Sequence, residues 1–501
     1  MIQASFGRKL ILCILCLMLV SQTIFHVSSS SKKHTLFQFD DVKVIRVALY
    51  VGDGDELWVS DIFNYQWTIN GQIFMFEPTV IYAEDVLGCG SHPLTCEYFD
   101  VLVIGASARS YLLHGASNIW KEKIRDFVSE GGGYVGLCAG AILASCGFAH
   151  AASPFHYLVN NNILSIANVY IHDDFFGELQ YVLKNGFSIG HWIQMENKTM
   201  GYVDINTSVV SDDSNMIFSC YDQSYRHLTY AGGPGLLPAN QMDTAYGQIT
   251  PLLTYNEELM YTKPIHFYRP TPDGWVIWKN VSTNLQGTYA GMSTTYGSGR
   301  LVLYGPHPEL LLTINGTIYE YLDKGYSLYL PWFLQPSQYV FSYIGDMASY
   351  SNYWIIRRSV AYAAQVDNDS LPPMDETKIV CVRPWSIGNM IYVNDNQMFA
   401  NLSTFLLMIP KNREKEHTPL IIGDITVIGY TMHCNENLAV DFFIDDQYIE
   451  TLNPAWTDQR IKAIAYTTTI TQPLHGLHRL TFTATDSIGN RAWDGVDAFF
   501  I

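Results

Sequence analysis

Short apolar runs alternate with amphipathic segments over the first three quarters of the chain. Residues 43–51, 100–104 and 300–304 are rich in apolar, β-branched side chains and are too short for helices, so they predict buried strands. Residues 117–130 carry apolar side chains at helical spacing, and Ser117 is placed to cap that helix. Because strands and helices alternate, this region predicts a mostly parallel sheet with helices on both faces.

Three further segments continue this pattern. Residues 134–137 predict a short strand, residues 139–146 a helix of small side chains, and residues 353–365 a closing helix. The intervening stretch, residues 149–299, is rich in Asn, Gly and Tyr and shows no clear period. We expect it to hold extra strands and long loops over one end of the sheet.

The pattern changes after residues 371–375, where strand alternation replaces helical spacing. The clearest strands are residues 420–428, 438–444 and 478–485, separated by turns. About 125 residues of this kind favour an all-β sandwich. The segments VDFFIDDQYI and HRLTFTATDSIGNRA resemble strands of the immunoglobulin-like modules of secreted microbial proteins, so we expect an immunoglobulin-like β-sandwich domain over residues 369–501.

The N-terminus has the residue order of a secretory signal peptide. Arg8 and Lys9 precede the apolar run 10–20, and small residues follow at 27–31. We therefore expect a signal peptide over residues 1–30 and a secreted protein. The apolar run is short for a membrane span, but an uncleaved anchor that holds the chain at the cell surface is the alternative.

Charge excludes two classes of partner. The chain has 29 basic and 47 acidic residues, a formal net charge of −18, so neither nucleic acid nor an anionic membrane gains from contact with it. Sequons for N-glycosylation are compatible with export. They lie at Asn197, Asn206, Asn280, Asn315, Asn368 and Asn401.

The cysteine count leaves one thiol unpaired after export. Of the nine cysteines, Cys13 and Cys16 lie in the expected signal peptide, and an odd number remains for an oxidising compartment. The pairings considered are Cys89 with Cys96, Cys381 with Cys434 and Cys146 with Cys220, which would isolate Cys138.

Residues 136–140, Gly-Leu-Cys-Ala-Gly, predict a sharp turn between a strand and a helix. Small residues on both sides of Cys138 would let the thiol project from this elbow without backbone collisions. At a helix N-terminus, the backbone N–H groups and the helix dipole favour thiolate, and the Ala139 amide could stabilise an oxyanion.

Two other interpretations of this segment were weighed. The glycines at 131, 133 and 136 match a dinucleotide fingerprint, but they precede the strand instead of joining it to a helix, so no phosphate cradle forms. The other alternative is a structural, buried cysteine at the start of a small-residue helix.

A second chemical signal follows the strand predicted at residues 300–304. Pro306 and Pro308 exclude helix, and in an extended segment His307 and Glu309 point the same way. They would lie at the carboxyl end of a strand, where sites gather in open α/β sheets. A thiol at one strand end and a carboxylate-linked imidazole at another are the parts of a Cys-His-Glu triad.

The elbow and the later Gly-Pro-His-Pro-Glu resemble the class I glutamine amidotransferase-like superfamily. They are most similar to its subgroup named after the N-terminal domain of some biotin-protein ligases. The resemblance implies a flavodoxin-like, mostly parallel sheet with helices on both faces, in a domain over residues 31–368. It also implies Cys138 as nucleophile, His307 as base and Glu309 as the group that orients it.

The same resemblance implies residues that surround the triad. The turn from Tyr230 through Gly233 resembles the subgroup's Tyr-x-Gly-Gly-Pro and is expected in the substrate-binding region. The second oxyanion amide is expected from the loop after residues 100–104. Here that loop is Gly105 and Ala106, in place of the family's Pro-Gly-Gly.

The sequence therefore predicts an exported thiol hydrolase of amide C–N bonds, acting on a small molecule or peptide. The alternative is a non-catalytic protein on a retired amidotransferase-like fold, whose C-terminal module contacts a cell surface or glycan. No cofactor and no metal are expected, because the remaining histidines lack metal-ligand spacing. These histidines are His150, His156, His191 and His227.

Overall fold

The computed structural model describes most of the chain beyond residue 41, and Asp41–Ile501 form one compact unit. The expected signal peptide, Ala106 and Cys434 lie outside the described residues. The described residues are 42–51, 62–105, 115–151, 154–172, 193–194, 200–230, 232–262, 265–271, 274–281, 283–310, 312–322, 339–347, 350–375, 377–384, 390–399, 418–432, 438–458 and 463–501.

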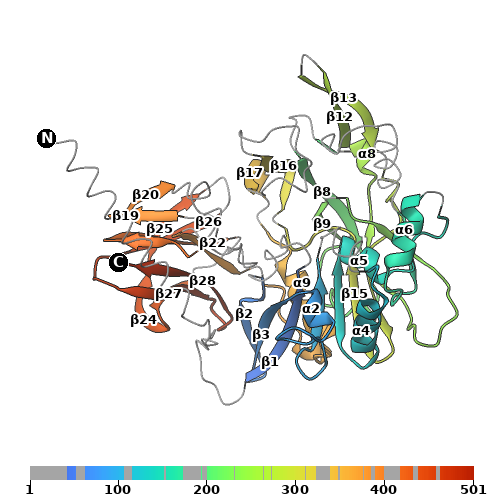
Figure 1. The fold of residues 1–501 in the computed structure, drawn as a ribbon, viewed down its shortest axis with the longest axis horizontal. Coiled ribbons are helices and arrows are strands. Elements are labelled where there is room, and N and C mark those ends of the chain that lie inside the picture. The colour runs from blue at the N-terminus through green and yellow to red at the C-terminus, as the bar shows by residue number, and fades with distance from the viewer. Residues whose placement is uncertain are drawn as a thin grey trace. The chain divides into compact units, whose positions relative to one another are not determined.

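Five parallel strands form the part of the sheet that carries the predicted motifs (Figure 1). Their order is β3, β1, β4, β5 and β15, and each neighbouring pair is parallel. Because parallel strands end at the same edge, the carboxyl ends of β5 and β15 lie side by side. The bounds are β1 (Val42–Tyr50), β3 (Gln72–Ile81), β4 (Val101–Ile104), β5 (Gly133–Leu137) and β15 (Gly299–Tyr304).

Antiparallel strands extend this sheet beyond β15. A hairpin pairs β15 with β14, and β14 in turn pairs with β10 and β11. The extending strands are β6 (Val169–His172), β8 (Met200–Val209), β9 (Tyr225–Tyr230), β10 (Gly235–Pro238), β11 (Thr250–Tyr255) and β14 (Tyr289–Tyr296). A separate antiparallel sheet contains β7 (Ile193–Gln194), β12 (Ile265–Thr271) and β13 (Gly274–Val281). β16 (Thr313–Leu322) pairs with β17 (Tyr339–Met347) and also with β8, so both belong to the large sheet.

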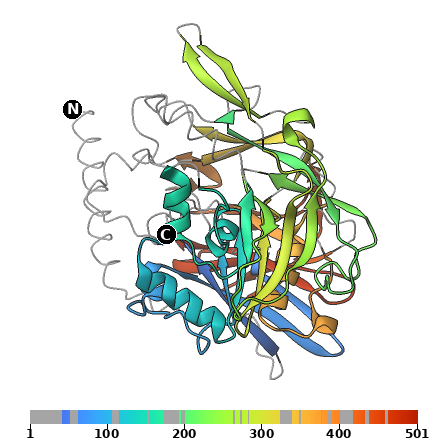
Figure 2. The same cartoon turned by 90° about the vertical axis from the view of Figure 1, so that its right-hand side faces the viewer.

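Helices contact the parallel strands through alternating side chains of β1. Ala48 and Tyr50 pack in one apolar cluster with α4, which Figure 2 shows in cyan against the strands. Val47 and Leu49 point the other way, into a cluster with α9. The helices are α2 (Ala83–Val86), α4 (Asn118–Ser129), α5 (Ala139–Ala144), α6 (Pro154–Asn162), α8 (Leu259–Thr262) and α9 (Tyr353–Ala363), with a 3-10 turn at Asn368–Ser370.

The predicted fold class is nevertheless wrong. Over the described residues the chain is mostly β, in a large mixed sheet, and it is not a helix-rich, flavodoxin-like α/β fold. The physical reason lies between the elbow and His307. A parallel sheet needs a crossover helix for each added strand, whereas much of this stretch folds into strands that pair antiparallel.

Beyond Ser370, every regular element that the structure describes is a strand. One sheet has the order β18, β22, β26 and β25, and a second group includes β23, β27 and β28. β28 also pairs with β2 (Tyr65–Ile69) at Tyr65 and Ala492. The domain boundary at residues 368 and 369 therefore stays a prediction. The strands are β18 (Lys378–Arg383), β19 (Met390–Val393), β20 (Asn396–Phe399), β21 (Leu420–Ile422), β22 (Ile425–Met432), β23 (Ala439–Ile444), β24 (Gln447–Leu452), β25 (Pro454–Asp458), β26 (Ala463–Ile470), β27 (Gly476–Thr485) and β28 (Arg491–Phe500).

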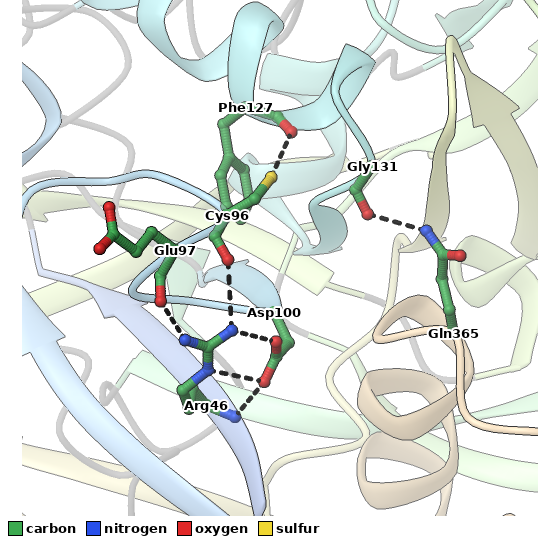
Figure 3. Close-up of polar contacts among 7 residues, drawn as sticks. All are labelled: Arg46, Cys96, Glu97, Asp100, Phe127, Gly131 and Gln365. Atoms are coloured by element: carbon green, nitrogen blue, oxygen red, sulfur yellow. Dashed lines mark hydrogen bonds and ion pairs between the residues drawn. The ribbon is translucent and has the colours of Figure 1, made fainter.

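An ion pair links β1 to Asp100, the residue directly before β4. Figure 3 shows the Arg46 guanidinium against the Asp100 carboxylate, with Nη2 and Oδ1 2.6 Å apart and Nε and Oδ2 3.1 Å apart. The same guanidinium donates to the Glu97 carbonyl, and nearby the Gln365 amide donates to the Gly131 carbonyl at 2.9 Å. These contacts lie at the amino edge of the parallel strands, opposite the edge where sites gather, so they stabilise the sheet.

Ser117 caps α4 as the sequence predicts. Its hydroxyl accepts a hydrogen bond from the Trp120 amide at 3.3 Å. Ser117→Ala should lower the free energy of unfolding by about 1 kcal/mol in urea titrations, because one amide of the first turn loses its partner. Ser129→Ala is the matched control at the other end of α4, where the hydroxyl is exposed, and should change it by less than about 0.5 kcal/mol. Equal losses would contradict the capping role.

Within the part of the chain that the structure describes, no helix combines the length and apolarity needed to cross a bilayer.

Candidate active site

Cys138 lies in a strained elbow between β5 and α5. Its backbone has φ 51° and ψ −105°, and residues other than glycine rarely adopt a positive φ. Such a conformation costs about 1–3 kcal/mol and clusters at functional sites. The side chain is buried, and its sulfur is a free thiol.

The glycines on either side of Cys138 are required by close backbone contacts. A Cβ at Gly136 would lie 2.7 Å from the carbonyl carbon of Gly140, and a Cβ at Gly140 would lie 2.0 Å from the carbonyl oxygen of Ile104. The structure thus gives the steric reason for small residues two positions before and after the thiol.

Backbone hydrogen bonds hold the elbow against both neighbouring strands. The Cys138 amide donates to the Tyr304 carbonyl at 2.8 Å, and the Gly140 amide donates to the Gly105 carbonyl at 3.1 Å. The Ala139 amide makes no hydrogen bond to a residue that the structure describes. Ala139 therefore has a donor left for an oxyanion. Gly105 supports α5 through its carbonyl, and its predicted companion Ala106 is not described.

His307 lies just beyond the end of β15 and is fixed by its backbone and its ring. Its amide donates to the Thr229 carbonyl at 2.7 Å, in an isolated antiparallel bridge to β9. Its Nδ1 lies 2.6 Å from Oε1 of Glu309, and both side chains are at most 5% exposed. The segment is bent here instead of extended as predicted, but the expected His–Glu contact is present.

The surroundings of His307 favour the imidazolium. Burial lowers the pKa of His307, but the Glu309 carboxylate and the Cys138 sulfur raise it by more, so the pKa is raised well above its usual value. Because Nδ1 is held by Glu309, Nε2 is the nitrogen left for the thiol. Nε2 is buried and has no hydrogen-bond partner among the described residues. The structure therefore brings Cys138, His307 and Glu309, the predicted triad, together.

Glu309→Gln should lower the pH at which His307 loses its proton. With the pKa of His307 raised by Glu309, the folded chain keeps this proton above about pH 6.5, where an unfolded histidine releases it. The stabilisation that the proton provides is complete below about pH 6.5 and is lost as the pH rises through the raised pKa. Imidazole ¹⁵N shifts across the pH range measure the change. An unchanged midpoint in the variant would contradict the role of Glu309.

Gly233 packs against the segment that carries His307. A Cβ at Gly233 would lie 1.7 Å from the carbonyl oxygen of Gly305, so this turn packs backbone to backbone against the segment that carries His307. Tyr230 is buried, with its ring against Tyr255. Of the two residues predicted in the substrate-binding region, Gly233 therefore lies against the His307 segment and Tyr230 follows Thr229, the bridge partner of His307.

The expected disulfides are not present among the described residues. The six described cysteines, including both members of the pairs Cys89 with Cys96 and Cys146 with Cys220, are free thiols. Cys381 is also free, and its expected partner Cys434 is not described. Among the described residues, no three His, Cys, Asp or Glu side chains are grouped as metal ligands would be.

Sequence reasoning missed two residues beside the triad. His227 of β9 contacts Asp204 of β8, with Nδ1 and Oδ2 2.9 Å apart. One signal could have found His227: strand alternation places residues 227 and 229 on one face. Nothing in the sequence identifies Asp204 as its partner, because the pairing of β8 with β9 joins residues far apart in the chain.

Comparisons with known proteins do not assign this chain to a family. No family model matches this chain, and no curated protein matches it. Among solved structures, a cytoplasmic protein from Salmonella typhimurium LT2 is similar at 12% identity and a TM-score of 0.24, over 52% of this chain and 88% of that one. A β-galactosidase from Bacillus circulans sp. alkalophilus is similar at 8% identity and a TM-score of 0.31, over 84% of this chain and 41% of that one. Both TM-scores are too low to support a fold or a function.

Proposed function

We propose that this chain is an exported thiol hydrolase that cleaves the C–N bond of small amides or peptides. Cys138 is the nucleophile, His307 the base and Glu309 the group that orients the imidazole. One observation supports the proposal most strongly. Cys138 is a free thiol in a strained elbow and raises the pKa of the buried His307 imidazole, whose Nδ1 contacts the Glu309 carboxylate. A structural cysteine needs neither the strain nor the paired imidazole.

The proposed reaction runs in two halves. The Cys138 sulfur attacks the amide carbon while His307 holds the thiol proton, and the Ala139 amide donates to the oxyanion. The C–N bond then breaks, the amine leaves with the proton from His307, and a thioester remains on Cys138. A water gives a proton to His307 and attacks the thioester, which releases a carboxylic acid and restores the thiol.

The wider identity of the chain also stays a proposal. The motifs around the triad support a relationship with the class I glutamine amidotransferase-like superfamily. The fold does not add support, because the chain forms a large mixed sheet in place of the flavodoxin-like sheet that the resemblance implies. Export rests on the residue order of the N-terminus.

Release of amines from a panel of simple amides and short peptide amides tests the proposal. Wild type should release amine, and Cys138→Ala should release it at least about 10³-fold more slowly, because the triad acts as a unit. Cys96→Ala is the matched control, since that half-buried thiol donates to the Phe127 carbonyl away from the triad. Equal rates for wild type and Cys138→Ala would overturn the hydrolase and favour the non-catalytic binding protein.

A further inference from the structure

The bridge between His307 and Thr229 fixes which face of β9 meets the triad. In an antiparallel bridge the two paired side chains project to the same face. Thr229 is in turn the register partner of Asp204 on β8. His307, Thr229 and Asp204 therefore form one row across three neighbouring segments, with their side chains on one face.

His227 lies on this same face, two residues along β9 from Thr229. Two residues span about 6.6 Å of strand, and diagonal neighbours across a bridge lie about 7–8 Å apart. The His227 backbone position is therefore about two residues of extended chain away from that of His307. Its Nδ1 is held by the buried Asp204 carboxylate, and its Nε2 makes no hydrogen bond to a described residue.

Exposure along this face of β9 rises steadily away from the triad. Thr229 is 2% exposed, the His227 side chain 22%, and Tyr225, whose ring contacts His227, 51%. An extended peptide laid along these side chains would run from solvent to Cys138. Outward from the triad it would pass Thr229 and then meet the His227 imidazole.

We propose that His227 binds a carbonyl oxygen of a peptide substrate, about two residues from the bond that Cys138 attacks. Asp204 is a positioning residue that holds the imidazole with Nε2–H toward the substrate. The substrate is then an extended peptide and not a simple primary amide. This inference rests on the proposed function, because it assigns the substrate of the same triad.

Two alkylating probes that share the same leaving group, chloride, test this proposal. Chloroacetamide and chloroacetyl-alanyl-alanine amide react with the thiolate in the same way: a C–S bond forms, the C–Cl bond breaks and chloride leaves. Both carry an amide carbonyl next to the reacting carbon, and only the second carries further peptide carbonyls beyond it. The ratio of their rates at Cys138, followed by mass spectrometry, measures binding to those carbonyls, while a merely structural defect would slow both probes alike.

In wild type the peptide probe should react faster than chloroacetamide. His227→Phe should lower the ratio about tenfold, the factor expected from one lost hydrogen bond of about 1.4 kcal/mol. His478→Phe is the matched control, because it removes another Asp-paired imidazole, 2.6 Å from Asp445, in the C-terminal strands. It should leave the ratio unchanged. Asp204→Asn, which keeps an acceptor for Nδ1–H, should retain more of the ratio than Asp204→Ala.

The two failures are distinguishable. Equal rates for both probes in wild type, or an unchanged ratio in His227→Phe, overturn the peptide subsite. If chloroacetamide labelling of Cys138 still depends on His307 in that case, the proposed hydrolase is not contradicted. Slow chloroacetamide labelling that does not depend on His307 overturns the proposed function and the subsite with it.

Discussion

Replacing His307 by alanine should slow alkylation of Cys138 by chloroacetamide near neutral pH by about 10²-fold or more. The imidazole stabilises the thiolate, which is the reactive form, and a positioned base contributes a factor of this size. Rates are measured at Cys138 by mass spectrometry under conditions in which the chain stays folded. The exposed surface is unaffected by the change, since His307 is buried.

His478→Ala serves as the control for this result. His478 is also bonded to a carboxylate, but on β27, far along the chain from the elbow. It should leave the rate at Cys138 within about twofold, as expected for a residue outside the unit that activates the thiol. An unchanged rate in His307→Ala would mean that the imidazole does not activate the thiol, and would favour the non-catalytic binding protein.

Gly140→Ala should lower the free energy of unfolding by about 3 kcal/mol. The added Cβ would lie 2.0 Å from the carbonyl oxygen of Ile104, which is backbone and cannot rotate away, so α5 or β4 has to shift. The same shift moves Cys138 relative to His307. We therefore expect slower alkylation of the thiol as well as an earlier urea midpoint.

Gly88→Ala separates this steric effect from the general cost of replacing glycine. Gly88 has φ 78° but open space around a Cβ, so its replacement should cost about 1 kcal/mol from backbone strain alone. Equal losses in the two variants would mean that the close approach at the elbow is not what requires Gly140.

The local sequence predicted the elbow and the triad because their geometry depends on short-range constraints. Gly136 and Gly140 leave room for a sharp turn at Cys138, and the prolines at 306 and 308 exclude helix around His307. The burial of β4, β5 and β15 follows from their apolar composition, which places these strands in the centre of the sheet. The meeting of Cys138 and His307 then follows from two parallel strands that end at one edge.

The fold class could not be predicted in the same way. The order of strands beyond β15 is set by pairings between distant segments, such as β8 with β9 and β11 with β14, and no local pattern states which strands pair or in which direction. The motif resemblance suggested crossover helices where the chain forms hairpins. The pairings of Cys89 with Cys96 and of Cys146 with Cys220 are absent for a related reason, because spacing shows which thiols are near in sequence and not which ones meet in space.

The order in which the thiols of the folded chain react with chloroacetamide near neutral pH tests the triad most directly. Cys89 and Cys220 are exposed, whereas Cys138 is only 8% exposed, so exposure alone would make the first two react fastest. An activated nucleophile predicts the reverse, with Cys138 modified first despite its burial. Modification of Cys89 and Cys220 while Cys138 stays intact would contradict a catalytic role for the elbow.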